Sequence, residues 1–212
     1  MKEKIKEMIN LQNKLNNETN GEDWVTTGLT KEKRKINWFR CIYMEAAEAM
    51  DSLNWKHWKN LNAEEDFKNV EIELVDIWHF ILSQKIVDEG VYSAIDILNK
   101  KYNEFESNKD ISLLDSLDNI LKNAANKEID IKEFYRAVDL LENFDMEKVY
   151  SLYIGKNCLN SFRQDHGYKD KTYIKIWNGK EDNVYMQKII ESEKDITFDE
   201  LYTKLEEIYK TL

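Results

Sequence analysis

The chain has 212 residues, no proline and six glycines, where average usage would give roughly ten prolines and roughly fifteen glycines. These two residues form most tight turns, so a β-sandwich, a β-barrel or another hairpin-rich fold is disfavoured. The formal charge of −10 argues against a protein that binds polymeric nucleic acid or a membrane surface, because both need a net basic footprint. The composition, 34% charged and 42% hydrophobic, is typical of a soluble helical protein with a hydrophobic core.

The two cysteines, Cys41 and Cys158, have no metal-ligand spacing and fit a reducing compartment. The chain contains no apolar run long enough to cross a membrane, and its first residues lack the apolar core of a signal peptide. We therefore expect a cytoplasmic protein with no membrane partner.

Hydrophobic spacing predicts successive amphipathic helices in chain order. They cover about 3–15, 30–52, 65–89 (ending at Gly90), two or more within 91–126, others within 129–159, and 198–209. A break is expected at 16–28, and a loop or short extended piece at 166–179. No repeat or low-complexity linker is present. The predicted fold class is all-α: one compact multi-helix domain, residues 1–212, with a central helical bundle that carries a carboxylate metal site.

Two pairs of carboxylates lie on the second and third predicted helices. Glu45 and Glu48 are three residues apart, on the flank opposite an apolar stripe formed by Ile36, Phe39, Tyr43, Ala46 and Met50. The third helix is apolar on nearly every side, so we expect it to be buried all round. It nevertheless contains Glu73 and Asp76, again three residues apart on one face.

A buried, unpaired carboxylate costs several kcal/mol, so such a group must be neutralised, paired with a basic side chain or bound to a cation. Two antiparallel helices could place all four carboxylates around one point. Oxygen ligands of this kind suit a hard divalent ion, Mg²⁺ first and Mn²⁺ second. A structural salt-bridge network remains the other interpretation of the same pattern.

The acidic balance of the chain reverses between residues 156 and 175. Lys156, Asn160 and Arg163 follow one another at helical spacing, so one face could offer an ammonium, an amide and a guanidinium to phosphate oxygens. An ordinary solvated face is the alternative. The chain has no glycine-rich phosphate loop, zinc spacing or nucleophilic serine elbow, which favours a metal-activated water as the nucleophile.

These residues resemble the dimeric dUTPases of the all-α NTP pyrophosphatase superfamily. The resemblance rests on Glu45-Ala-Ala-Glu48 with Glu73-Leu-Val-Asp76, and on four motifs in family order. These are residues 51–59, which end in Trp55-Lys-His-Trp-Lys59; residues 69–80; residues 156–169, which end in Phe162-Arg-Gln-Asp-His-Gly-Tyr-Lys169; and Glu181-Asp-Asn183. It implies an all-α homodimer that hydrolyses dUTP, and dUDP, to dUMP with Mg²⁺. The middle of the chain, about 91–150, and its tail are not covered.

The resemblance also implies a role for individual residues. Glu45, Glu48, Glu73 and Asp76 would hold the metal, and Glu45 would orient or deprotonate the attacking water, with Glu48 beside it as a catalytic carboxylate. The phosphates would be bound by Lys156, Asn160, Arg163, Tyr168 and Lys175. The base and sugar would be contacted by Gln12, Asn16, Trp55, Trp58 and Phe80.

One departure and three alternatives remain open. Lys171 stands where the family has a small turn residue, glycine, which affects the backbone between Lys169 and Tyr173. A pyrophosphatase of the same superfamily could act on another nucleotide. A di-iron helical bundle is suggested by Asp76-x-x-His79, but the second carboxylate-x-x-His that it needs is absent. A non-enzymatic helical interaction module explains neither the carboxylates nor the basic block.

Overall fold

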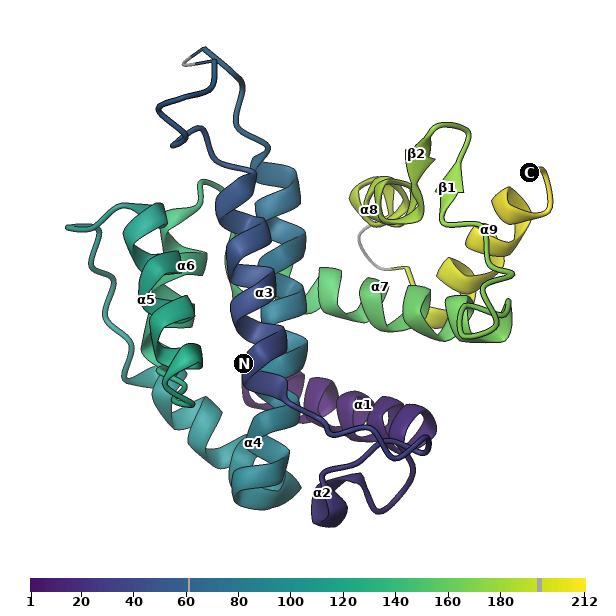
Figure 1. Cartoon of the computed structure of the whole chain (residues 1–212), viewed down its shortest axis with the longest axis horizontal. Coiled ribbons are helices and arrows are strands. Elements are labelled where there is room, and N and C mark those ends of the chain that lie inside the picture. The colour runs from purple at the N-terminus through teal and green to yellow at the C-terminus, as the bar shows by residue number, and fades with distance from the viewer. Residues whose placement is uncertain (61, 194–195) are drawn as a thin grey trace. The chain divides into compact units, whose positions relative to one another are not determined.

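Helices make up about 67% of the chain in the computed structural model, which describes residues 1–60, 62–193 and 196–212 (Figure 1). The described part contains nine helices and one two-stranded hairpin, so the predicted all-α fold class is confirmed. The chain divides into two units, Met1–Val149 and Tyr150–Leu212, which are described separately below. The single domain stays a prediction. No helix in the described part is long and apolar enough to cross a membrane.

The elements follow one another in chain order. The helices are α1 (Lys2–Asn20), α2 (Trp24–Thr27), α3 (Trp38–Asp51), α4 (Phe67–Asn103), α5 (Leu113–Ala125), α6 (Ile131–Leu140), α7 (Met146–Asp165), α8 (Asp182–Ser192) and α9 (Phe198–Tyr209). The strands β1 (Ile176–Trp177) and β2 (Lys180–Glu181) pair in antiparallel fashion between α7 and α8.

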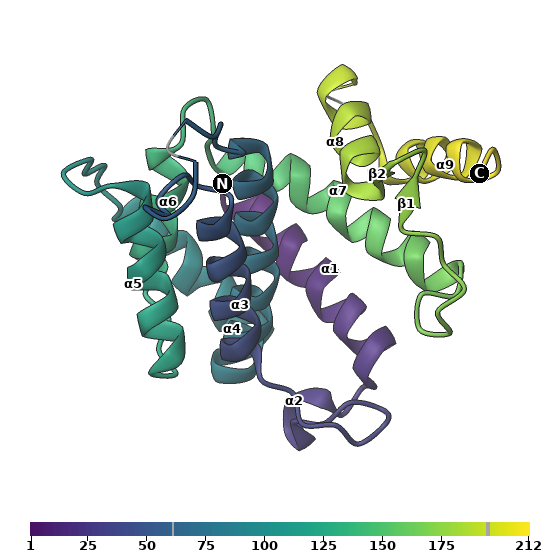
Figure 2. The ribbon, with the colours of Figure 1, turned by 45° about the horizontal axis from the view of Figure 1, so that its top comes forward.

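Helices α3 and α4 form an antiparallel pair at the centre of the first unit (Figures 1 and 2). At one end the Ser52 carbonyl accepts a hydrogen bond from the Asp66 amide at 2.9 Å. At the other end the rings of Trp38 and Phe80 stack with centroids 5.9 Å apart. Helix α1 packs on α4, while α5 packs on α3 and on α6. The α3–α4 pair therefore packs against α1, which precedes it in the sequence, and against α5 and α6, which follow it.

Helix α3 begins eight residues later than the sequence predicts, at Trp38 and not at Thr30. Lys33 adopts a left-handed conformation with φ of 61°, and Leu29 pairs with Lys35 across the resulting turn. Asn37 then caps the helix, its side chain accepting a hydrogen bond from the Arg40 amide at 3.0 Å. The first helix was predicted too short, because α1 continues to Asn20.

The buried face of α3 differs from the predicted stripe. The buried residues are Ile42, Ala46 and Ala49, while Phe39 and Tyr43 are only half-buried. The helix contacts α4 on one side and α5 on the other, so its covered surface is wider than one stripe. This arrangement turns the flank that carries Glu45 toward α4 rather than toward solvent.

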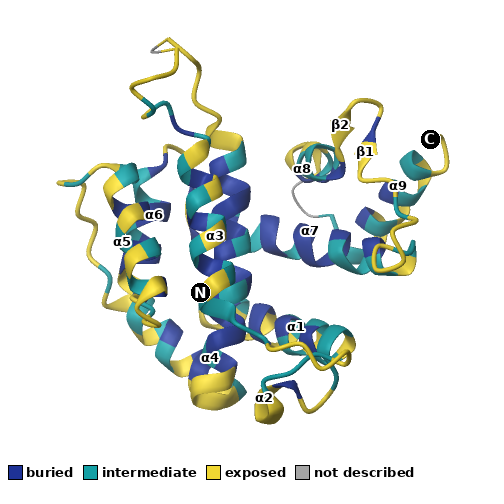
Figure 3. Ribbon diagram, viewed as in Figure 1, coloured by how far each residue is buried: buried dark blue, intermediate teal, exposed yellow. Residues whose placement is uncertain are grey.

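Helix α4 is buried on nearly every side over its first half, as its apolar sequence predicts (Figure 3). Trp78 is fully buried and stacks on Phe134 of α6 with centroids 4.7 Å apart. Gly90 has φ of 74° and ψ of 162°, which interrupts the helical backbone where the sequence predicts an end. The straight part of α4 is therefore the part that carries Glu73 and Asp76.

In the second unit the hairpin and α9 surround one aromatic cluster. Asn178 and Gly179 have φ of 46° and 83°, the conformation that an Asn-Gly turn favours between two short strands. Trp177 is fully buried, and Phe162 and Tyr209 lie within 6.1 Å of its ring centre to centre. The predicted extended piece at 166–179 and the predicted helix at 198–209 are both confirmed.

Candidate active site

Three of the four predicted metal ligands meet between α3 and α4. Glu45 comes from α3, and Glu73 and Asp76 come from α4; one carboxylate oxygen of each lies within 4.8 Å of the others. Glu73 is buried, and the other two are half-buried. Three hard oxygen donors at this separation could surround a divalent cation such as Mg²⁺. In the described chain, Glu48 lies outside this acidic group and is exposed.

The acidic group is electrostatically strained. Burial raises the pKa of Glu45 to about 8, helped by the negative charges of Asp76 and Glu73, by a hydrogen bond with the Glu73 carboxyl group and by the charge of Glu48. Carboxylates this close cannot all ionise without mutual repulsion. A bound divalent cation would relieve this repulsion, so the donor set fits a metal.

A neighbouring amide orients Glu73. The Nδ2 atom of Asn69 donates hydrogen bonds to Glu73 Oε1 at 3.0 Å and to Ser52 Oγ at 2.8 Å. Asn69 lies one turn before Glu73 on α4, and Ser52 is the residue that ends α3. The amide therefore ties the ligand to both helices and fixes its rotamer.

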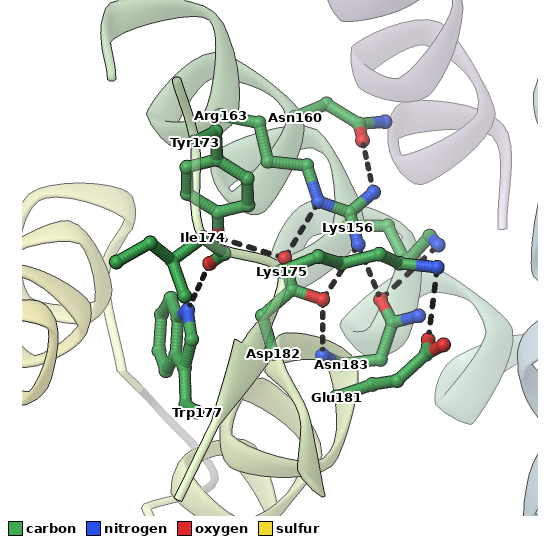
Figure 4. A network of polar contacts seen from close by, with 10 residues as sticks. All are labelled: Lys156, Asn160, Arg163, Tyr173, Ile174, Lys175, Trp177, Glu181, Asp182 and Asn183. Atoms are coloured by element: carbon green, nitrogen blue, oxygen red, sulfur yellow. Dashed lines mark hydrogen bonds and ion pairs between the residues drawn. The ribbon is translucent and has the colours of Figure 1, made fainter. Parts of the chain in front are cut away.

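In the second unit the predicted phosphate-binding residues Lys156, Asn160 and Lys175 lie near a buried ion pair between Arg163 and Asp182 (Figure 4). Arg163 donates from Nε and Nη2 to the two carboxylate oxygens of Asp182, at 2.8 Å and 2.7 Å. Asp182 has no exposed surface. Its burial acts to raise its pKa, but the hydrogen bonds and charge of Arg163 outweigh this and lower the pKa. One edge of the Arg163 guanidinium, formed by Nε and Nη2, therefore binds the Asp182 carboxylate.

The remaining edge of Arg163 faces the other polar side chains of the group. Nη1 donates to Asn160 Oδ1 at 3.3 Å, and Nη2 also reaches Asn183 Oδ1 at 3.4 Å. The ammonium of Lys156, a buried residue, donates to the same Asn183 oxygen at 3.3 Å. We call Lys156, Asn160, Arg163, Asp182 and Asn183 the cationic network (Figure 4).

Two predicted phosphate ligands lie at the border of the cationic network. Lys175 is exposed and pairs with Glu181 at 3.0 Å. The guanidinium carbon of Arg163 lies 5.8 Å from the centre of the Tyr168 ring, a cation–π contact. All five predicted phosphate-binding residues are therefore in or next to one network of the second unit.

A protein-family model described as dUTPase matches residues 4–168. The chain belongs to the all-α dUTPase family. It is therefore a dUTP diphosphatase, which hydrolyses dUTP as a nucleotide pyrophosphatase. No curated protein matches the sequence.

In this dUTPase the predicted base and sugar residues separate into two places. Gln12 and Asn16 are buried, and Gln12 Oε1 lies 2.7 Å from Nδ1 of His79. Phe80 is the next residue on α4. Trp55 and Trp58 follow the C-terminal end of α3, with ring centres 5.6 Å apart and both rings exposed.

The distance between these two places limits which residues can contact the same part of the substrate. Phe80 faces Trp38, the first residue of α3, while the Trp55 indole donates to the carbonyl of Met50 near its last turn. Twelve residues of helix separate Trp38 from Met50, or about 18 Å. Phe80 and the Trp55–Trp58 pair cannot contact the same ring, although each stays a candidate for part of the substrate.

The sequence alone assigns no role to five residues of these groups: Trp38, Asn69, Tyr173, Asp182 and Asn183. Asp182 and Asn183 belong to the motif Glu181-Asp-Asn183, which supports the family resemblance but gives neither residue a role. Asn69 begins the other motif on α4, one turn before the ligand that it orients. Trp38 and Tyr173 are recognisable only from their packing.

The departure at Lys171 has a backbone explanation. Lys171 has φ of 60°, the left-handed region that glycine adopts without strain. Lys171→Gly is expected to stabilise the second unit by about 0.5–1 kcal/mol, because the side chain is exposed and the strain is removed. Urea unfolding measures the change. Lys169→Gly, two residues earlier at an exposed position without positive φ, is the control and should not stabilise; equal effects of the two would contradict the strain.

Proposed function

We propose that this dUTPase hydrolyses dUTP and dUDP to dUMP with Mg²⁺, for which Mn²⁺ could substitute, as a cytoplasmic homodimer. The observation that carries the proposal is the meeting of Glu45, Glu73 and Asp76 from two helices within 4.8 Å. Such a group is costly unless a cation neutralises it. The chain belongs to the dUTPase family, and dUTP carries a negatively charged triphosphate that hard divalent ions bind.

Glu45, Glu73 and Asp76 would hold the metal, with Glu48 as a further ligand from the exposed side of α3. Bound Mg²⁺ would neutralise phosphate oxygens and make a water molecule more acidic. Glu45 is our candidate for the group that orients this water and accepts its proton, because it is the one member of the acidic group that comes from α3 and faces the two carboxylates of α4. Glu48, near enough for its charge to act on Glu45, would support this role.

The phosphates would be bound by Lys156, Asn160, Arg163, Tyr168 and Lys175. Asp182 engages the edge of Arg163 formed by Nε and Nη2, so the substrate would meet the Nη1 group, which donates to Asn160 Oδ1 in the structure. We therefore propose that Arg163 binds a phosphate oxygen through Nη1 rather than as a complete fork. Lys156 would add a point charge beside it.

Gln12 and Asn16 would read the uracil edge through their amide groups, and Phe80 would pack on the deoxyribose. The Gln12 amide donates to Asn16 Oδ1 at 3.3 Å, and Asn16 donates to Ser83 Oγ at 2.9 Å. These two hydrogen bonds fix the orientations of the amide groups before substrate binds, as a site that recognises a base by hydrogen bonds requires. Trp55 and Trp58 lie at the opposite end of α3 from Phe80, so they would flank another part of the nucleotide than the uracil edge that Gln12 and Asn16 read.

The two other enzymatic interpretations differ in their support. In the described chain the acidic group contains no histidine, and Nδ1 of His79 lies against Gln12, which disfavours a di-iron site. Action on another nucleoside triphosphate is the remaining alternative, because carboxylates that hold a metal and basic side chains that bind phosphates would serve any nucleoside triphosphate.

The test is release of phosphate or diphosphate from dUTP and dUDP against dTTP, dCTP and UTP, with Mg²⁺, with Mn²⁺ and with a chelator. We expect turnover of both deoxyuridine nucleotides that the chelator abolishes and Mg²⁺ restores. At least a hundredfold preference over UTP and dTTP is expected for a site that reads the base and sugar. Full activity in the chelator would contradict the metal role, and equal turnover of dTTP would favour the broader pyrophosphatase.

A further inference from the structure

The last residue of α9 packs on the segment that precedes the hairpin. The Tyr209 ring is nearly parallel to that of Tyr173, at an angle of 11° with centroids 5.3 Å apart. Its hydroxyl accepts a hydrogen bond from the Ile174 amide at 3.1 Å. Tyr209 lies outside residues 4–168, the part that the family model matches.

Tyr173 connects this contact to the cationic network. Its hydroxyl donates a hydrogen bond to Asp182 Oδ2 at 2.7 Å, the same oxygen that accepts from Arg163 Nε (Figure 4). Asp182 is fully buried, and Arg163 is 9% exposed. A continuous set of contacts therefore runs from Tyr209 through Tyr173 and Asp182 to the guanidinium of Arg163.

Among the rings that contact Tyr173, that of Tyr209 is nearest: the rings of Phe162, Tyr168 and Trp177 lie 6.0–6.5 Å away, against 5.3 Å for Tyr209. Residues 168–172 are exposed, and Lys171 adopts a left-handed conformation there. On the hairpin side, the Trp177 indole donates to the carbonyl of Ile174 at 2.7 Å. Tyr209 is the one of these rings that stacks on Tyr173 and also accepts from the next amide, Ile174, so its removal should let the Tyr173 hydroxyl shift.

We propose that Tyr209 is a positioning residue for substrate binding: through Tyr173 and Asp182 it holds the Nη1 edge of Arg163 in the orientation that accepts a phosphate oxygen. The inference rests on the proposed phosphate-binding role of the cationic network. It gives the C-terminal helix α9 a part in recognition of the nucleotide.

The test compares Tyr209→Leu, which removes the ring contact, with Tyr209→Phe, which keeps it. For Tyr209→Leu we expect KM for dUTP to rise about tenfold, with kcat within about threefold of wild type. The dissociation constant of inorganic diphosphate, measured by calorimetry, should rise in parallel. Tyr209→Phe should stay within about twofold, because water can replace its hydroxyl at the exposed Ile174 amide. Tyr202→Phe, on the same helix, is the matched control and should leave KM unchanged.

A direct readout is the NMR signal of the Arg163 Nε–H group, which the Asp182 hydrogen bond shifts downfield. This signal should broaden or move in Tyr209→Leu and stay in place in Tyr209→Phe and Tyr202→Phe. An unchanged signal and an unchanged KM in folded Tyr209→Leu would overturn the inference. A fall in kcat and thermal stability with KM unchanged would also overturn it, since that is a structural effect alone.

Two further variants complete the test. If Tyr209→Leu does not fold, Tyr173→Phe takes its place: it keeps the ring contact but loses the bond to Asp182, and KM should rise about fivefold or more. Unchanged KM in Tyr173→Phe would overturn the inference. Lys156→Met tests the phosphate-binding role of the cationic network separately from the role of Tyr209. Unchanged KM in that variant would refute the phosphate-binding role itself. A raised KM for Lys156→Met with normal KM for Tyr209→Leu would refute the role of Tyr209 only.

Discussion

Glu45→Gln is expected to lower kcat for dUTP by about three orders of magnitude or more while the fold is retained. The amide cannot accept a proton from water and is a weaker ligand for Mg²⁺ than a carboxylate. Steady-state kinetics with saturating Mg²⁺ measures the loss, and circular dichroism verifies the helical content. The matched control is Glu142→Gln, at an exposed position of the same unit, which should retain full activity.

The same substitution should stabilise the metal-free protein above neutral pH. Because the folded-state pKa of Glu45 is raised to about 8, its ionisation opposes folding, and stability falls as the pH rises from the ordinary carboxyl range toward 8. Glutamine removes this loss, a gain of about 1–2 kcal/mol at pH 9 because solvent still screens the half-buried site. Urea unfolding in chelator at pH 5 and pH 9 measures it. Wild-type turnover, or a variant that is less stable at pH 9, would contradict the role of Glu45.

Arg163→Ala is expected to destabilise the second unit by about 3–5 kcal/mol, because it leaves the fully buried Asp182 carboxylate without its guanidinium. Hydrogen exchange of residues 150–212 should accelerate, while exchange in residues 1–149 should change little. KM for dUTP should also rise, since the Nη1 edge is lost.

A double variant separates the two effects of Arg163. Arg163→Met with Asp182→Leu removes both charges and should recover most of the stability, because a buried pair can be replaced by apolar side chains of similar volume. It should not recover affinity for the nucleotide. Normal exchange in Arg163→Ala would show that the ion pair does not hold the unit together, and full affinity in the double variant would exclude Arg163 from phosphate binding. Acid has a related effect: the lowered pKa of Asp182 means that the pair's contribution is lost as the pH falls through that value.

The spacing of carboxylates within each helix could be read from the sequence, and so could the buried character of α4. Two antiparallel amphipathic helices bring such pairs together in only a few registers, which is why Glu45, Glu73 and Asp76 were predictable as a group. The partner of Arg163 was not predictable, because Asp182 lies beyond a hairpin and on another helix. Nor could the sequence reveal the start of α3, which depends on a left-handed turn at a lysine, a residue that rarely adopts it.

Which face of α3 is buried also depended on tertiary packing. A single stripe from Ile36 to Met50 assumes one neighbour, whereas α3 has α4 and α5 as neighbours. The position of Trp55 and Trp58 depends on the connection after α3, whose path no periodicity encodes. Local spacing therefore predicted donor groups, and packing determined which of them share a site.

The antiparallel pairing of α3 and α4 limits how the length of this sequence can change during evolution. Ser52 faces Asp66, Glu45 faces Glu73 and Trp38 faces Phe80, so contacts recur along both helices in one register. Inserting one residue inside either helix would rotate everything beyond it by about 100° and carry a carboxylate away from its partners. Insertions between the two helices leave this register intact. Relatives of this chain can therefore be expected to differ in the length of that connection far more than in the number of residues between their paired ligands.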